Sequence, residues 1–83
     1  MRFVASLKKK PKRILKHRKV IGDAIRVHRQ EAGLTQEGLA EFVDLNPKYI
    51  GEVERGEKII SIEALLRIAE AVKTPMSEFF RGV

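Results

Sequence analysis

Apolar residues recur every three or four positions through most of the chain, which is the spacing of helices that bury one face. The first helix is expected over residues 20–32, where Ile21 and Ile25 fall on one face and Gly33 follows as a helix-ending residue. Ile14 lies seven residues before Ile21, so the helix has room to run back into the preceding basic segment when the charge there is neutralised. No stretch of the sequence predicts a strand.

Two shorter helices are expected next, each opened by a residue type that caps helices well. Thr35 precedes the first of them, and Asn46 with Pro47 opens the second, which Gly56 ends. Residues 35–55 therefore form two short helices joined by a tight turn, with polar side chains at the start of the second helix pointing outward. Their inward positions are expected to be Leu39, Ala40, Val43, Ile50 and Val53.

The last third of the chain predicts one longer helix and a short final one. Ser61 is a suitable N-cap for a helix from Ile62 to Val72, and Thr74-Pro75 opens the final helix. Either Ile59 or Ile60, in the loop before Ser61, is expected to fill the edge of the core. The inward stripe of the longer helix is expected to be Ile62, Leu65, Ile68, Ala69 and Val72. The fold class is therefore all-α, with five helices.

The net charge of +6 is divided unevenly along the chain. Residues 1–19 hold nine Lys/Arg and no Asp or Glu, whereas residues 20–83 hold eight Lys/Arg and eleven Asp/Glu, a net charge of −3. We therefore divide the chain into a basic, flexible N-terminal arm, 1–19, and a folded domain, 20–83. The arm favours a polyanionic partner, although a solvated tail without a dedicated partner is the simpler alternative. Its apolar face is too thin to favour a membrane surface.

The composition argues against several classes of function. At 83 residues the chain forms one domain at most, with little room for a small-molecule pocket. It has no cysteine and only two histidines, so no disulfide, metal site or cofactor is expected. No apolar run approaches the length of a membrane span, and no acid/base pair or phosphate-binding loop indicates an enzyme. A cytoplasmic protein is expected.

Several sequence blocks agree in order and spacing with a known family. They are GLTQ, LA, the YIG…ERG run, LLRIAEAV and PMSEFF. Together they make residues 20–80 resemble the Cro/C1-type (XRE-like) helix-turn-helix regulators, which include phage repressors and the small controller proteins of restriction–modification systems. The PMSEFF block is most similar to the controller proteins. The resemblance implies a lambda-repressor-like DNA-binding domain that regulates transcription in a bacterium or a phage.

The resemblance also implies roles for single residues at double-stranded DNA. In such a unit the second helix of the motif enters the major groove while the first crosses the backbone. Base reading is expected from Lys48, Tyr49 and Glu52, because Lys can donate to guanine and Glu can accept from cytosine. Pro47 stands where a polar residue is often found, so one usual base contact is expected to be missing. Contacts to the DNA backbone are expected from Gln36, Asn46, Arg55 and Lys58.

Three further sets of residues receive a role. Arg29 and Glu54 match positions that form a partly buried ion pair in the family. Members of the family commonly pair through their last two helices, and the apolar candidates for a homodimer interface here are Leu66, Met76, Phe79 and Phe80. The arm has no counterpart in the shared motif. Its cations are expected to follow the DNA backbone or the adjacent minor groove, and they include Lys8, Lys9, Lys10, Lys12, Arg13, Lys16, Arg18 and Lys19.

Two other functions remain open from the sequence alone. The first is a protein-interaction module of the same fold, such as an antitoxin-like subunit, which the net charge of −3 on residues 20–83 keeps in view. The second is a non-specific nucleic-acid binder that depends on the basic tail. The preferred hypothesis is a transcription regulator that binds a palindromic operator as a dimer, because one recognition helix reads only a few base pairs.

Overall fold

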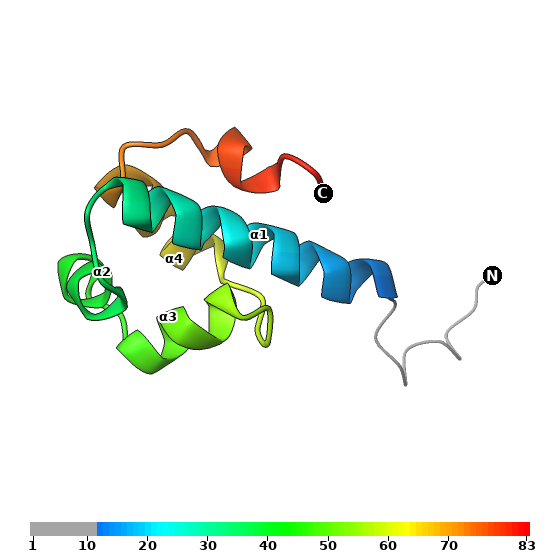
Figure 1. Cartoon of the computed structure of the whole chain (residues 1–83), viewed down its shortest axis with the longest axis horizontal. Helices are drawn as coiled ribbons and strands as arrows, with labels where there is room; N and C mark the ends of the chain where they lie inside the picture. Colours follow the sequence, from blue (N-terminus) through cyan, green and yellow to red (C-terminus); the bar gives the residue numbers. More distant parts are fainter. Residues whose placement is uncertain (1–11) are drawn as a thin grey trace.

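The computed structural model describes residues 12–83 and contains four α-helices followed by one 3-10 helix. They are α1 (Lys12–Glu31), α2 (Gln36–Val43), α3 (Pro47–Glu54), α4 (Ile62–Ala71) and η2 (Met76–Phe80). Figure 1 shows α1 running through the middle of the molecule, with α3 below it and η2 above it. The residues described hold no strand, which confirms the all-α class. The fifth element is a 3-10 helix, so the expectation of five α-helices is wrong.

The helix α1 is longer than the sequence predicts. It begins at Lys12 rather than at residue 20, so residues 12–19 form the helical start of α1. Residues 1–11 lie outside the part of the chain that the structure describes. Repulsion between the basic side chains of residues 12–19 favours a helix that starts after them. This repulsion is outweighed because adding turns to a helix already anchored by Ile21 and Ile25 costs much less free energy than starting a new helix.

Side-chain caps begin the three helices that follow α1, as predicted. Thr35 Oγ1 accepts a hydrogen bond from Gly38 N at 2.9 Å, and Asn46 Oδ1 accepts one from Lys48 N at 2.8 Å. Ser61 Oγ accepts a third from Ala64 N at 3.1 Å. Each bond satisfies a backbone N–H that has no partner within its own helix. The bounds of α2, α3 and α4 therefore follow from local sequence.

The core lies between all five elements and is formed by small and aliphatic side chains around one aromatic ring. Phe79 of η2 is fully buried, and Ile60 fills the edge of the core while Ile59 stays 52% exposed. Ile62 is 64% exposed, so the prediction that it faces inward is wrong. The buried apolar residues are Ile21, Ile25, Leu39, Ala40, Val43, Ile50, Val53, Ile60, Ala64, Leu65, Ile68, Ala69 and Phe79.

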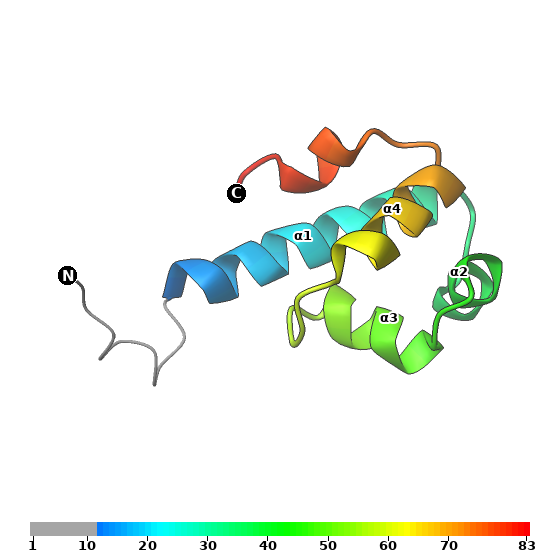
Figure 2. The same ribbon diagram turned by 180° about the vertical axis from the view of Figure 1, so that it is seen from behind.

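A close approach of backbones fixes α1 against α3. A Cβ atom at Gly22 would collide with the carbonyl oxygen of Val53 and would lie 2.9 Å from that of Glu54. Only glycine therefore fits at this crossing. The contact sets the distance between α1 and the last turn of α3, and Figure 2 shows the two helices side by side from behind.

Candidate nucleic-acid interface

Apart from the cations of the arm, seven residues are expected to contact DNA. Five of them line one hollow on the outer face of α3. The hollow is formed at the start of the helix and by the loop that follows it, and its lining residues are Asn46, Lys48, Tyr49, Glu52 and Lys58. Lys48 is exposed, while Tyr49 and Glu52 are half-buried. The hollow therefore combines cationic, anionic and aromatic groups at the start of α3.

The two remaining residues lie together over Gly51, which is buried. An ideal Cβ at Gly51 would be 3.1 Å from Arg55 Nη1 and 3.5 Å from Gln36 Oε1. Because glycine has no side chain, Gln36 and Arg55 close over the middle of α3 from two sides. All seven residues expected at DNA thus surround one helix, α3.

Glu52 already has a cationic partner in the hollow. Lys58 Nζ lies 3.2 Å from Glu52 Oε1, and the Glu52 side chain is 18% exposed whereas that of Lys58 is 56% exposed. The pair joins α3 to the loop before α4. Because Lys58 is more than half exposed, its end of the pair contributes little to stability and can turn to another anion at low cost. Glu52 is then free to accept from a group on a ligand.

Tyr49 has a structural contact that the sequence does not reveal. Its hydroxyl oxygen accepts a hydrogen bond from the backbone N–H of Ser61 at 3.0 Å. The ring also packs against the core. The side chain therefore connects α3 to the start of α4, and its hydroxyl is engaged before any ligand arrives.

A buried ion pair connects α1 to the last residue of α3. Arg29 Nε donates to Glu54 Oε2 at 2.7 Å, and Arg29 Nη2 donates to Glu54 Oε1 at 2.9 Å. Arg29 Nη1 also donates to the carbonyl oxygen of Leu34 at 2.9 Å. The hydrogen bonds to Glu54 raise the pKa of Arg29 above its ordinary value, against the opposing effect of burial. The two side chains are 9% and 2% exposed, so the two-pronged contact is held away from water.

Gln36 extends this pair to the surface. Gln36 Nε2 donates to Glu54 Oε1 at 3.0 Å, and Gln36 is the first residue of α2. The carboxylate of Glu54 therefore orients the amide of Gln36. Its other atom, Oε1, lies toward Gly51.

Arg55 pairs with the loop that follows α3. Its Nε donates to Glu57 Oε2 at 2.8 Å, and its Nη2 donates to Glu57 Oε1 at 3.2 Å. These hydrogen bonds raise the pKa of Arg55 and lower the pKa of Glu57. Both side chains are more than half exposed, so water and salt weaken the contact. Arg55 can therefore turn to another anion.

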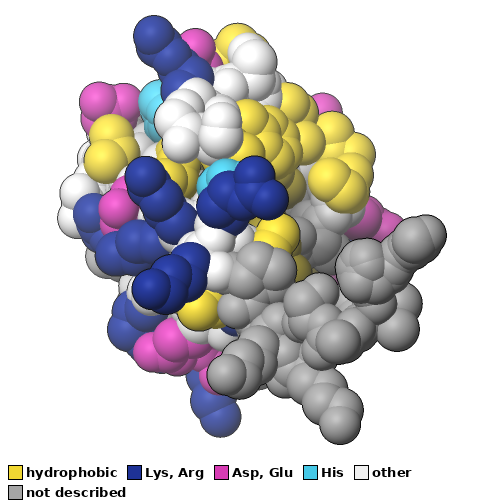
Figure 3. All heavy atoms as spheres, turned by 90° about the vertical axis from the view of Figure 1, so that its right-hand side faces the viewer, with side chains coloured by type: hydrophobic (Ala, Val, Ile, Leu, Met, Phe, Trp, Pro, Cys, Tyr) yellow, Lys and Arg dark blue, Asp and Glu magenta, His cyan; other side chains and the backbone are white. Residues whose placement is uncertain are grey.

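The described cations of residues 12–19 lie on α1, beyond the body of the domain. Lys12, Arg13 and Lys16 are exposed, and Lys19 Nζ is 2.9 Å from Asp23 Oδ1. Figure 3 views the molecule from the end where α1 starts, and Lys and Arg side chains gather on one side of that end. The same figure shows hydrophobic side chains on the opposite side. Lys8, Lys9 and Lys10 lie outside the described residues.

The four residues expected at a dimer interface are not equally available. Leu66 is 51% exposed and Phe80 is 38% exposed, whereas Met76 packs against the core. Phe79 is fully buried, so its assignment to an interface is wrong. In a 3-10 helix neighbouring residues are separated by about 120°, so two adjacent rings cannot both point into the core. Ile62, which the sequence analysis did not include, lies one helical turn before Leu66 on the same face of α4.

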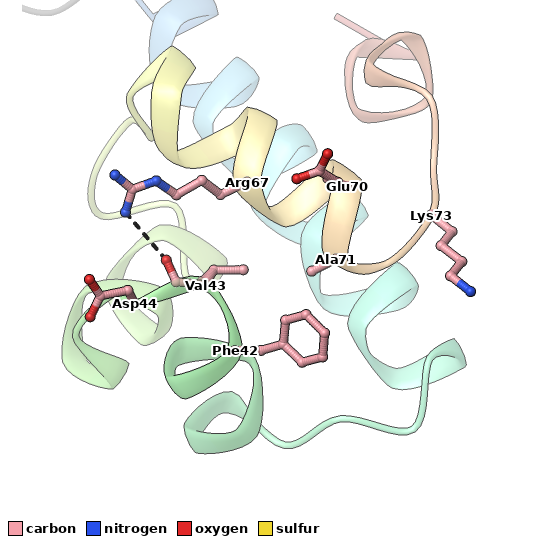
Figure 4. Close-up of a pocket in the computed structure, with 7 residues that line it drawn as sticks. All are labelled: Phe42, Val43, Asp44, Arg67, Glu70, Ala71 and Lys73. Carbon is pink, nitrogen blue, oxygen red and sulfur yellow. Dashed lines mark hydrogen bonds between the residues drawn. The ribbon is translucent and has the colours of Figure 1, made fainter.

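A second hollow lies between the end of α2 and α4, on the side shown in Figure 4. Arg67 of α4 donates to the carbonyl oxygen of Val43 at 3.3 Å and to Glu63 Oε2 at 2.6 Å. Phe42 is 70% exposed at its edge. Arg67 therefore connects α4 to the C-terminal end of α2, where the backbone is turning toward α3.

Residues 12–83 contain no group of three or more His, Cys, Asp or Glu side chains arranged to hold a metal ion. Within the same residues, none of the helices combines the length and the apolar character that crossing a membrane requires. His28 instead packs its ring against Phe79, with the ring centroids 5.4 Å apart.

The comparisons with known proteins agree with this geometry. Residues 25–79 match the family model described as helix-turn-helix. The control protein C.SmaI of Serratia marcescens is 35% identical over 57 residues, which cover 69% of this chain and 68% of the relative. The crystal structure of the restriction-modification controller protein C.AhdI from Aeromonas hydrophila superposes with a TM-score of 0.72 at 35% identity, over 76% of this chain and 96% of that one. The clp gene regulator ClgR from Corynebacterium glutamicum also has a TM-score of 0.72, at 33% identity, over 76% of this chain and 67% of its own.

Proposed function

Because the chain belongs to the helix-turn-helix family, we propose that it regulates transcription by binding double-stranded DNA at specific sequences. The observation that carries this proposal is the convergence of seven polar and charged residues around α3. An α-helix of this kind fits the major groove, where every base pair presents its own pattern of donors and acceptors. The exposed start of α3, with Lys48, is the part that would enter first.

In the proposed complex Lys48 donates to guanine O6 or N7. Lys58 leaves Glu52 and binds a phosphate, which is possible because the Lys58 end of the 3.2 Å ion pair is exposed. Glu52 then accepts from cytosine N4. Tyr49 presents its ring beside the bases while its hydroxyl stays on Ser61 N.

The backbone contacts follow from the groups at the edges of α3. Gln36 binds a phosphate at the start of α2, where unpaired N–H groups favour anions. Arg55 leaves Glu57 for a phosphate on the other side of Gly51. Asn46 contributes through its place in the cap of α3. Such contacts fix the position of α3 on the duplex without reading sequence.

We further propose that the chain acts as a homodimer on a palindromic operator. Two recognition helices related by a two-fold axis would read half-sites one helical turn apart, about 34–36 Å. The apolar face of α4 with Ile62 and Leu66, together with Phe80, offers an exposed surface for pairing.

Selection of bound duplexes from a random pool tests both proposals at once. We expect a two-fold symmetric consensus with half-sites about 10 base pairs apart. The variant Lys48→Ala with Glu52→Gln should fold normally, because Lys48 is exposed and Gln keeps the size of the half-buried Glu52 side chain. It should lose sequence discrimination. Lys73→Gln, an exposed cation at the far end of α4, serves as the control and should select the parent's sites. Unchanged selection by the double variant would contradict the assignment of α3.

The same experiment separates the other two functions. An antitoxin-like module, whose main target is another protein, finds support in the 70% exposed Phe42 and the 64% exposed Ile62. It would show only weak affinity for DNA, lost at physiological salt. A non-specific binder would yield no consensus while keeping a steep dependence on salt.

A further inference from the structure

The first two turns of α1 project beyond the rest of the domain. A helix of 20 residues is about 30 Å long. Figures 1 and 2 show the N-terminal end of α1 extending past the end of α3, with the two views agreeing. We call residues 12–19 the α1 extension. It is a regular helix, and it continues the segment whose Ile21 and Ile25 are buried in the core.

The α1 extension concentrates positive charge where a helix tolerates it least. It carries five Lys/Arg and no acid, and the first acid of α1 is Asp23. The N-terminal end of a helix dipole repels cations, and like charges four residues apart, as at Lys12 and Lys16, repel each other. Free of a ligand, these charges oppose the helix that carries them. A polyanion along the same face would remove both penalties.

Contacts with the end of α3 hold the α1 extension in place. An ideal Cβ at Gly56 would lie 3.2 Å from Lys19 Cα, so the turn after α3 lies directly against the backbone of α1. Arg18 Nη1 donates to the carbonyl oxygen of Glu57 at 3.5 Å. Arg18 Nε is buried without a hydrogen-bond partner, which shows how closely the loop covers this side chain. Together with the contact of Gly22 with the Val53 and Glu54 carbonyl oxygens, these contacts hold α1 against the end of α3 at two places along α1.

We propose that the α1 extension is a rigid second contact surface, which binds phosphates of the duplex beside the base pairs that α3 reads. This inference rests on the proposed function and specifies its geometry. Because α1 and α3 are fixed to one another, the phosphates contacted lie at a defined distance from the half-site. Lys12 and Lys16 are the contacting residues, since both are exposed and one helical turn apart, while Lys19 is already paired with Asp23.

A flexible basic arm and a rigid basic helix differ in one measurable way. A flexible arm binds DNA through its charge alone, whereas a rigid helix binds through charges held at fixed positions. The first test removes charge. In Lys12→Gln with Lys16→Gln, ethylation of the flanking phosphates should no longer interfere with binding. The salt slope of binding should fall by about 1.8, at roughly 0.9 per phosphate. Lys73→Gln removes an exposed cation that follows α4 and should leave both readouts unchanged.

The second test keeps the charge and breaks the helix. Proline at position 17 removes a helical hydrogen bond and clashes with the preceding turn, whereas alanine there preserves the helix. With the full chain, His17→Pro should lower affinity for the selected operator roughly tenfold, because freed residues must be ordered again on binding. It should also spread the ethylation interference over more flanking phosphates. His17→Ala should have the affinity and the interference pattern of the parent.

The outcomes separate this inference from the proposed function. Equal affinity and equal interference patterns for His17→Pro and His17→Ala would overturn the rigid contact surface and leave a flexible arm. Circular dichroism of the free proteins reports whether the body of the domain remains folded in His17→Pro. Should it not, the parent's ethylation pattern and the charge variant decide: interference spread over many flanking phosphates, or an unchanged salt slope, overturns the inference. If the parent selects no sequence from the random pool, the proposed function itself fails.

Discussion

At the scale of single residues, the hydrogen bonds around Glu54 connect the stability of the fold to the surface proposed to face DNA. Glu54 accepts from both Arg29 and Gln36, so one carboxylate holds a buried guanidinium and orients a surface amide. A buried charge that loses its partner keeps the full cost of leaving water. Substituting one partner of the pair therefore destabilises the fold strongly, whereas replacing both partners by apolar residues need not do so.

Glu54→Ala should lower the free energy of unfolding by about 3–5 kcal/mol, because Arg29 is left buried and unpaired. Urea unfolding followed by circular dichroism measures this. Glu57→Ala, which removes the exposed partner of Arg55, is the matched control and should leave the midpoint unchanged. An unchanged midpoint for Glu54→Ala as well would mean that the Arg29 pair behaves as a surface contact.

Tyr49→Phe should remove an acceptor from Ser61 N while keeping the aromatic ring. The expected loss of stability is at most about 1 kcal/mol, because the bond is accessible to water. Site selection should be the same as for the parent, since the hydroxyl is already engaged. A changed consensus for Tyr49→Phe would instead assign the hydroxyl to base reading.

Two residues mark the limit of what sequence periodicity predicts at this scale. Ile62 and Leu65 share a spacing that suited one inward stripe, but the buried arc of α4 is centred on Ala64, Leu65 and Ile68, and Ile62 falls beside it. The sequence offered both Phe79 and Phe80 for an interface, but it did not say which of the two rings is buried in the core. Only tertiary packing decides between such alternatives, because each ring has the same local neighbours.

At the scale of elements, the caps and the helix-turn-helix were predictable because their causes are local. Thr35, Asn46 and Ser61 each bond a backbone N–H within three residues. The turn needed a left-handed residue, and Asp44 adopts it at φ 59°. The start of α1 was not predictable in this way, since it depends on a helix anchored farther along the chain and on the loop after α3. The hydrogen bond from Ser61 to Tyr49 was hidden for the same reason.

The crossing of α1 and α3 gives a prediction at this scale. Gly22→Ala improves helix propensity, yet its Cβ would meet the Val53 carbonyl oxygen, so the helices must separate. We expect a loss of about 1–3 kcal/mol, as for other overpacked sites. Thermal and urea unfolding measure it, and Gln30→Ala on the exposed face of α1 serves as the control. A stabilised Gly22→Ala variant would show that the two helices have room to move apart.

At the scale of the whole molecule, the proposed function asks one small domain to recognise its site with a single helix. In that proposal the described domain reads DNA from one face, around α3, and it exposes apolar side chains on α4. Pairing through α4 would double the reading surface and cover Ile62 and Leu66 in the same step. The affinity of the proposed dimer then depends on protein concentration, because assembly and binding are linked.

Ile62→Glu with Leu66→Glu should convert the proposed dimer to a monomer of 9.5 kDa, because like charges would face each other across a two-fold axis. Sedimentation equilibrium measures the mass, and both side chains are exposed, so the domain itself should stay folded. The monomer should bind a single half-site as before but lose its preference for paired half-sites. Phe42→Gln is the control, since it removes an exposed apolar side chain from α2 and should leave the dimer intact. Dissociation of Phe42→Gln, with an intact dimer for the α4 variant, would move the interface to the hollow between α2 and α4.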